Sequence, residues 1–376
     1  MNILFLSWRD IKHPHSGGAE INNFEQAKVW IKKGHSVTVF SSMFPHAKSE
    51  EIIDGIEVFR KGSQVLGVHF QFFLWYLFTT KEKFDIVIDQ FHGIPFFTPF
   101  FVRVKKIAYI HEVAKEVWLM NPWKWPLNVI VGSLGKYIEP LIFKLYQNIP
   151  FMTVSQSTKD DLINLGIPAK NITVILSGVT LHLPKPLPKK ENTKTLMYLG
   201  AVAEDKGVRD AIKTFALVHS KDHKTKLWIV GKGEEHIVAK LKLLCKELGV
   251  YSSVDFKGFV SKEDKFKYLA KAHVLINPSV REGWGLVNIE SAACGTPVVA
   301  YDVPGVRDSV KNNKTGILVP KSKGSDGLAK ATESLLKNKS LYEKLSKESK
   351  KWGTSFSWER MGEESEAYLK KQVSQK

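Results

Sequence analysis

SVREGWGLVNIESAACG, residues 279–295, is the stretch around which the rest of the chain can be organised. It follows an apolar run with a polar exit, HVLINP (273–278), which is typical of a buried strand. Two glycines flank a tryptophan in the loop that comes next. The spacing of Leu286, Ile289 and Ala293 then predicts a short helix, which the glycine at the end of the stretch terminates. The stretch therefore predicts a strand, a glycine-rich loop and a helix start.

The start of this predicted helix is suited to an anion, because it offers unpaired backbone N–H groups and the positive end of the helix dipole. Glu282 precedes the helix and Glu290 lies inside it. On one continuous helix their backbones would be about 12 Å apart. Paired carboxylates of glycoside hydrolases are only roughly 5 to 9.5 Å apart. We therefore expect the two carboxylates to bind hydroxyl groups in different parts of one ligand, such as a nucleotide-sugar.

In the setting PSVREGWGLVNIESAACGTPVVA (278–300), this spacing resembles the donor site of the group 1 (family 4) retaining glycosyltransferases of GT-B fold. The resemblance covers essentially the whole chain. It implies an α/β protein with two Rossmann-like, doubly wound domains facing a central cleft. It also implies that Glu282 binds hydroxyls of the donor sugar and that Glu290 binds the ribose. Backbone donors to the pyrophosphate would come from Leu286 and Val287, and the loop residues Gly283, Trp284 and Gly285 would complete this part of the donor site.

Other donor-binding residues follow from the same resemblance. Lys206, in GAVAEDKG (200–207), matches the family's phosphate-binding lysine, whereas Ala201 replaces the arginine of that pattern. Phe259 and Val260 resemble the turn whose backbone contacts the nucleotide base. The resemblance makes Lys206 a catalytic residue together with Glu282 and a histidine in the first half of the chain.

That histidine is His111, directly after the apolar run IAYI (107–110), at a strand end where doubly wound folds place functional groups. A lone histidine at a strand end is more often structural, but the resemblance implies that His111 reaches the donor sugar. Gly17 and Gly18 precede a predicted helix, where glycines are also common as a cap. In the resembling family this position approaches the donor phosphates and the acceptor.

Strand and helix patterns alternate in both halves, which favours doubly wound α/β domains. Residues 181–194 contain three prolines within five positions and show no periodicity, so they are predicted to link the domains. The expected domains are 1–180, for the acceptor, and 195–352, for the nucleotide-sugar. Residues 353–376 are expected to form a helix, which by the resemblance crosses back to the first domain.

The chain has 55 lysines and arginines against 38 acidic residues, a net charge of +17. This excess favours an anionic partner such as a nucleotide, a nucleic acid or an acidic membrane surface. A thermophile-like surplus of lysine is an alternative explanation. The chain contains no recognisable nucleic-acid recognition module, so nucleic acid is not an expected partner.

Two aromatic stretches bear on membrane contact. Residues 65–78 are nearly all apolar but fall short of the roughly 20 residues that span a bilayer, so helices packed on a sheet are expected there. Residues 117–131 combine Trp118, Trp123, Lys124 and Trp125 with prolines. That mixture is typical either of an interfacial membrane anchor or of an apolar acceptor cleft.

The expected function is retaining transfer of a hexose from a donor of the UDP-glucose or GDP-mannose type to a glycan or lipid-linked acceptor, in cell-surface or protein glycan assembly. A GT-B epimerase or hydrolase acting on nucleotide-sugars, or a basic nucleic-acid-binding protein, are the alternatives. No D-x-D sequence occurs, so neither a metal nor a cofactor is expected. Only Cys245 and Cys294 occur and no secretion signal is visible. These features suit a cytoplasmic protein, with the inner face of the cell membrane as a candidate location.

Overall fold

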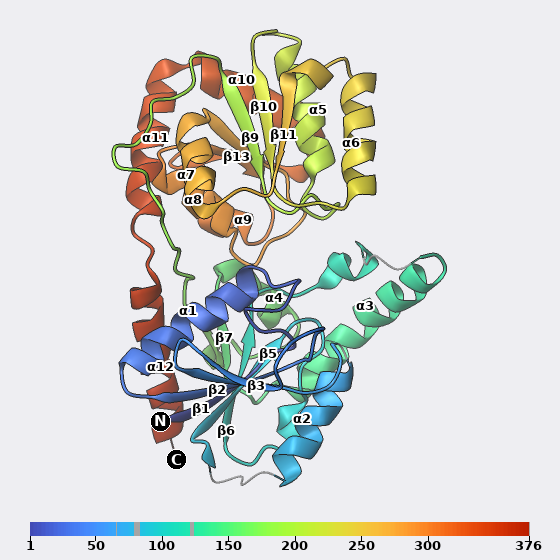
Figure 1. Cartoon of the computed structure of the whole chain (residues 1–376), viewed down its shortest axis with the longest axis vertical. Helices are drawn as coiled ribbons and strands as arrows, with labels where there is room; N and C mark the ends of the chain where they lie inside the picture. The colour runs from blue at the N-terminus through green and yellow to red at the C-terminus, as the bar shows by residue number, and fades with distance from the viewer. Residues whose placement is uncertain (65, 79–82, 121–123, 376) are drawn as a thin grey trace. The chain divides into compact units, whose positions relative to one another are not determined.

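The computed structural model describes residues 1–64, 66–78, 83–120 and 124–375 of the chain. The chain forms two compact units. The first unit contains Met1–Gly178 together with the end of the chain, Ser357–Lys376. The second unit contains Val179–Phe356. Each unit has its own sheet with helices packed around it (Figure 1).

The first unit is built on an eight-stranded sheet in the order β3-β4-β2-β1-β5-β6-β7-β8. All neighbouring strands are parallel except β3 and β4 at one edge. The central strands β1 (Asn2–Leu6) and β5 (Ile86–Phe91) are almost wholly buried, as expected when helices cover both faces of a sheet. The other strands are β2 (Ser36–Ser41), β3 (Glu50–Ile53), β4 (Ile56–Arg60), β6 (Lys105–Ile110), β7 (Phe151–Thr153) and β8 (Ile172–Val174).

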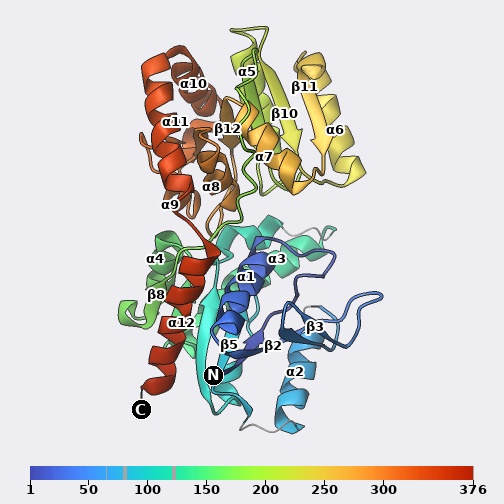
Figure 2. The same ribbon diagram turned by 60° about the vertical axis from the view of Figure 1, so that its left-hand side comes forward.

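Five α-helices and three short 3₁₀ helices are described in the first unit. They are α1 (Gly18–Lys32), α2 (Leu66–Phe78), α3 (Leu127–Leu145), α4 (Gln156–Asn164), α12 (Trp358–Ser374), η2 (Thr98–Phe100), η3 (Lys115–Met120) and η4 (Ala169–Asn171). Helix α12 packs along α1, where the buried Trp30 indole N–H donates to Ser365 Oγ at 3.0 Å (Figure 2). The final helix therefore belongs to the first unit although the second unit separates it from the rest in sequence.

The second unit has a six-stranded, wholly parallel sheet in the order β11-β10-β9-β12-β13-β14. Its strands are β9 (Thr195–Leu199), β10 (Lys226–Val230), β11 (Val254–Gly258), β12 (Val274–Asn277), β13 (Val298–Tyr301) and β14 (Gly316–Val319). Its helices are α5 (Val208–His219), α6 (Glu235–Glu247), η5 (Tyr251–Ser253), α7 (Lys262–Lys271), α8 (Leu286–Ala293), α9 (Val306–Ser309), η6 (Lys321–Lys323), α10 (Gly324–Lys337) and α11 (Lys339–Gly353).

The strand order of this sheet reverses at β9, which pairs with β10 on one side and with β12 on the other. Open parallel sheets bind their ligands outside the carboxyl ends of the strands at such a reversal. The loops that leave β9 and β12 there are residues 200–207 and 278–285. The topology thus brings together two of the loops that are predicted to bind the donor.

The strand, loop and helix predicted around residues 279–295 are confirmed as β12, a loop and α8. Residues 181–194 form neither strand nor helix, and Leu181, Leu183 and Leu187 pack against the core of the second unit. Both cysteines are buried and free.

The apolar stretch 66–78 forms α2, and Val68, Phe72 and Tyr76 bury one of its faces against the first unit, as predicted. Val65 and residues 121–123, which include Trp123, lie outside the described residues. Of the helices that the structure describes, none is both long and apolar enough to pass through a membrane.

Candidate active site

The start of α8 is held rigidly by the residues around it. Gly285 caps the helix with a φ of 79°, a conformation that residues with a Cβ rarely adopt, and a Cβ there would lie 2.7 Å from Asn288 Nδ2. The Asn288 side chain accepts a hydrogen bond from Asn277 Nδ2 at 2.8 Å and donates one to Ser309 Oγ at 2.9 Å. The first backbone N–H groups of α8, those of Leu286 and Val287, therefore start from a fixed position and have no acceptor within the helix.

Lys206 and Glu282 form an ion pair beside this helix start. Lys206 Nζ lies 3.0 Å from Glu282 Oε1, and Ser279 Oγ donates to the same oxygen at 2.9 Å. The loop after β9 reaches the loop after β12 because Gly207 lies against Pro278, where a Cβ would be 2.1 Å from the carbonyl oxygen. The packing of these two loops thus places a cation and a carboxylate next to each other.

Glu290, inside α8, is paired with a second lysine. Its Oε1 lies 2.5 Å from Nζ of Lys265 on helix α7, and the residue is only 8% exposed. Burial raises the pKa of Glu290, and the charge and hydrogen bond of Lys265 act in the opposite direction. His182 lies near enough to lower that pKa slightly as well. Glu290 is therefore an acceptor whose charge depends on its neighbours.

The remaining residues expected in the donor site differ in how far their side chains are exposed to solvent. Trp284 is 4% exposed and its ring packs against Phe356, with ring centroids 5.4 Å apart, so only its backbone is available to a ligand. Gly283 lies next to it in the same loop. Phe259 is 83% exposed after β11, whereas Val260 packs partly against the core. The second unit thus offers one exposed aromatic ring at the end of the strand that precedes α7.

In the first unit, Gly17 is the N-cap of α1 and Gly18 is its first residue. Gly17 N–H donates to Glu20 Oε2 at 2.6 Å, and the other oxygen of this buried carboxylate lies 3.1 Å from Arg9 Nε. Arg9 reaches further to His92, whose Nε2 lies 3.1 Å from a guanidinium nitrogen. Glu20 therefore caps its own helix and anchors an arginine, and it connects the glycines to the end of β5.

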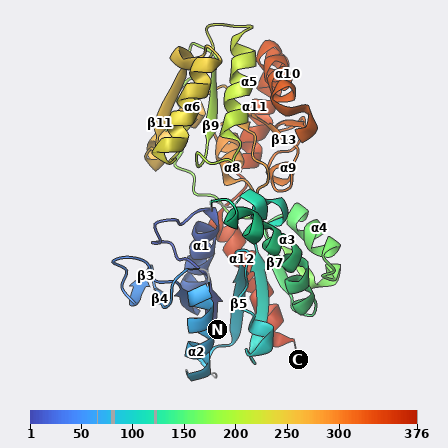
Figure 3. The ribbon, with the colours of Figure 1, turned by 90° about the vertical axis from the view of Figure 1, so that its right-hand side faces the viewer.

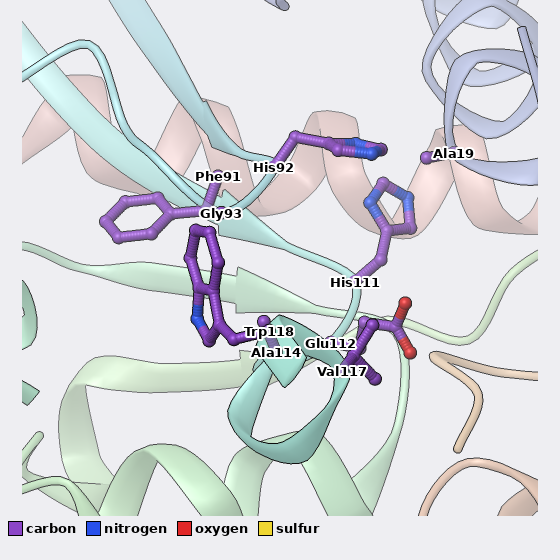
Figure 4. Close-up of a pocket in the computed structure, with 9 residues that line it drawn as sticks. All are labelled: Ala19, Phe91, His92, Gly93, His111, Glu112, Ala114, Val117 and Trp118. Carbon is purple, nitrogen blue, oxygen red and sulfur yellow. The ribbon is translucent and has the colours of Figure 1, made fainter. Parts of the chain in front are cut away.

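A pocket of about 230 Å³ opens beside this arrangement. It is lined by Ala19, Phe91, His92, Gly93, His111, Glu112, Ala114, Val117 and Trp118. Figure 4 shows the rings of His92 and His111 near each other beside Ala19, whereas the Trp118 ring lies at Gly93. The pocket therefore combines imidazole nitrogens with an aromatic wall.

His111 enters this pocket with both ring nitrogens buried and without a hydrogen-bond partner in the described part of the chain. Its backbone is fixed, because the carbonyl oxygen accepts from Thr158 Oγ1 at 2.9 Å and the ring packs on Tyr109. Burial lowers the pKa of His111 to about 3 and also holds the pKa of His92 well below its usual value. His111 is therefore a neutral imidazole near pH 7, with one donor and one acceptor available to a ligand.

Three residues of these sites were not predicted from the sequence to contact the site carboxylates or to line the pocket. His92 follows β5 as His111 follows β6, so the strand-end signal was present for both. Ser279 lay within the selected stretch, but only its hydrogen bond indicates its contact with Glu282. Lys265 has no local signal, because its link to Glu290 comes from the packing of α7 on α8.

Comparison with known proteins supports a single family. The chain matches the model of "Glycosyltransferase Family 4" over residues 16–183 and that of "Glycosyl transferases group 1" over residues 181–352. An uncharacterized glycosyltransferase of Haemophilus influenzae is 30% identical over 352 residues, which cover 93% of this chain and 95% of that protein. The chain belongs to the group 1 glycosyltransferases. An uncharacterized glycosyltransferase of Methanocaldococcus jannaschii is 24% identical and covers 97% of the chain and 96% of its own length.

Solved structures place this glycosyltransferase in the GT-B fold class, as predicted. Sucrose-phosphate synthase from Thermosynechococcus elongatus matches with a TM-score of 0.79 and 18% identity, over 98% of both chains. HepE of Anabaena, solved in complex with UDP-glucose, matches with a TM-score of 0.72 and 18% identity, over 99% of this chain and all of its own. The group 1 model spans Lys206, Glu282 and Glu290, and the family 4 model spans Gly17 and His111.

Proposed function

We propose that this glycosyltransferase moves a hexose, with retention of configuration, from a nucleoside diphosphate hexose to a glycan or lipid-linked acceptor. The observation that carries the proposal is the Lys206–Glu282 pair, at 3.0 Å, beside the capped start of α8. A cation, a helix N-terminus and a carboxylate side by side match the three parts of a sugar diphosphate, namely two phosphates and a ring with hydroxyls.

In the proposed complex, the diphosphate takes the place of Glu282 as the partner of Lys206 and also accepts from the N–H groups of Leu286 and Val287. Glu282 is thereby released to accept hydrogen bonds from hydroxyls of the sugar. Glu290 accepts from the ribose, and the backbone of the turn at Phe259 and Val260 contacts the base. Glu282 exchanges a lysine partner for hydroxyl donors, so it is not left unpaired in the complex.

During transfer, the bond between the anomeric carbon and the diphosphate oxygen breaks, and the acceptor oxygen bonds to the same face of that carbon. The leaving oxygen takes the proton of the acceptor hydroxyl. The negative charge that develops on the diphosphate is stabilised by Lys206 and by the α8 N-terminus. These groups supply the positive charge in this proposal, which therefore uses neither a metal nor a cofactor. In the pocket of the first unit, neutral His111 offers one donor and one acceptor to a sugar hydroxyl.

The experiment is a thermal-shift panel of UDP, GDP and their glucose and mannose conjugates, followed by product analysis with and without a glycan acceptor. We expect one base to stabilise the protein and its hexose conjugate to stabilise it further. NMR of the product is expected to show the anomeric configuration of the donor. Conversion of the donor without an acceptor as the main reaction would instead identify a hydrolase or an epimerase. No response to any nucleotide would refute the proposed site.

A further inference from the structure

Helix α2 is apolar except for His69 and Gln71, although only one side packs against the first unit. The buried Val68, Phe72 and Tyr76 lie on one face. Leu66, Phe70, Phe73 and Leu77 are spaced by three or four residues, form a stripe on the opposite face, and are exposed by 68, 61, 37 and 38%. An exposed helix normally turns polar residues to water. The exposed stripe of α2 is therefore suited to contact with an apolar partner and not with water.

Helix α3 carries a second, longer apolar stripe. Its members follow helical spacing and are all exposed: Leu127, Ile130, Leu134, Tyr137, Ile138, Leu141 and Leu145. A helix of 19 residues makes this stripe about 28 Å long. Figures 1 and 3 show α2 and α3 on the same side of the first unit. We refer to these two exposed stripes, taken together, as the α2–α3 surface.

The exposed charged side chains of α2 and α3, with Lys124 just before α3, are all basic. Lys124, Lys136 and Lys144 are exposed, and α2 contains no charged residue. The only carboxylate in α3, Glu139, is buried and accepts from the backbone N–H groups of Ala114 and Lys115, both at 2.9 Å. Both helices are described over their whole length, and neither exposes an acid.

We propose that the α2–α3 surface lies in the interface of an anionic phospholipid bilayer. Exposed apolar side chains with lysines nearby are typical of helices that rest in the plane of a membrane. The apolar stripe would enter the acyl boundary, and Lys124 before α3 and Lys144 at the edge of the stripe would contact anionic headgroups. A second copy of the chain fits less well, because a symmetric pair would place the lysines of the two copies against each other.

This surface is connected to the pocket of the first unit through η3. Glu139 holds the start of η3, and the Trp118 ring packs so closely on α3 that a Cβ at Gly135 would lie 2.4 Å from it. Resting on the proposed function, this connection means that the acceptor entering the pocket is itself carried by the membrane. Membrane binding by the α2–α3 surface can be tested without that assumption.

The test is sedimentation of the full-length protein with vesicles of phosphatidylcholine alone or mixed with phosphatidylglycerol. The variant Ile130→Glu/Leu134→Glu/Leu141→Glu changes three residues that are each 56% exposed. Its matched control, Leu217→Glu/Leu243→Glu/Leu248→Glu, adds the same charges at exposed leucines of the second unit. We expect the wild type and the control to bind the anionic vesicles, and the α3 variant to lose about tenfold or more in partitioning.

Failure of the wild type to bind anionic vesicles, or equal binding by both triple variants, would overturn the proposal. So would a dimer, detected by analytical ultracentrifugation, that the α3 variant converts to a monomer. Thermal shifts with UDP and GDP on the same samples report on the donor site separately. Loss of nucleotide response with intact vesicle binding would refute the proposed function alone, and the opposite result would refute the membrane surface alone.

Discussion

Lys206 Nζ and Glu282 Oε1 lie 3.0 Å apart, although 76 residues separate them in the sequence. The pair forms because β9 and β12 are neighbours in the sheet and both loops leave from the same edge. Each partner is suited to a different part of a sugar diphosphate.

Replacement of Lys206 by alanine should reduce kcat/KM for glycosyl transfer by about 100-fold or more, because in the proposed reaction the diphosphate then leaves without its cation. Glu282 remains partly exposed, so the fold should persist. Steady-state kinetics and thermal unfolding measure the two effects. Lys213→Ala, an exposed lysine on α5, is the control and should behave as the wild type. Equal activity of the two variants would remove Lys206 from the reaction.

Replacement of Glu282 by glutamine should separate binding of the nucleotide from recognition of the sugar. The uncharged amide no longer competes for Lys206, so the nucleoside diphosphate alone should bind as tightly as to the wild type or more tightly. The sugar hydroxyls lose a charged acceptor, so transfer should fall by about 100-fold. Titration calorimetry and kinetics measure both quantities. Weaker binding of the bare diphosphate would contradict the competition that the ion pair implies.

Burial of His111 should be visible in the pH dependence of stability. In the unfolded chain, His111 has the ordinary histidine pKa of 6.5 and is protonated below that pH. In the folded protein its pKa is about 3. Between these values the unfolded chain binds more protons, so the free energy of unfolding decreases as the pH falls. His111→Gln should make this dependence shallower by up to about 1.4 kcal/mol per pH unit. Urea unfolding at several pH values measures the slopes, and equal slopes would mean that His111 is not buried.

Lys265 should keep Glu290 ionised in the empty site. In Lys265→Met the pKa of Glu290 rises further, because burial then acts without the opposing charge. As the pH is lowered, Glu290 of this variant should therefore take up its proton, and nucleotide binding should begin to weaken, at a higher pH than in the wild type. Lys265→Arg keeps the charge and should restore the normal dependence. Affinity for UDP or GDP measured across pH tests this, and identical profiles for all three proteins would exclude the coupling.

The packing of Trp118 on α3 should control the pocket of the first unit. In Gly135→Ala the added Cβ would lie 2.4 Å from the indole, so the ring must move. We expect a raised KM for the acceptor with unchanged affinity for the donor nucleotide. Ser133→Ala on the same helix is the control. A change in nucleotide affinity instead would place the effect in the second unit.

The sequence predicted features whose residues are close together in the chain. The strand, loop and helix around Glu282 could be recognised because turn glycines and helical spacing occur within 17 residues. The alternation of strands and helices predicted two α/β sheets. The antiparallel edge strand β3 could not be predicted, because tertiary contacts decide which short strand pairs at an edge.

The partners of the site residues were harder to predict. Ser279 and Lys265 gain their contacts with the carboxylates only through loop geometry and helix packing. The sequence around Trp118 is compatible with a membrane anchor or a cleft, whereas the contact of Trp118 with Gly135 depends on the path of α3. The burial of Trp284 likewise follows from its contact with Phe356, which lies 72 residues further along the chain.

The Lys206–Glu282 pair has a further consequence for the selectivity of the site between small anions and larger ligands. A phosphate ion that captured Lys206 would release Glu282 without offering it any hydroxyl donor in return. A sugar diphosphate supplies both halves of the exchange at once. If the diphosphate displaces Glu282 as proposed, the resting contact therefore favours a ligand that brings its own hydroxyl groups over a bare phosphate ion.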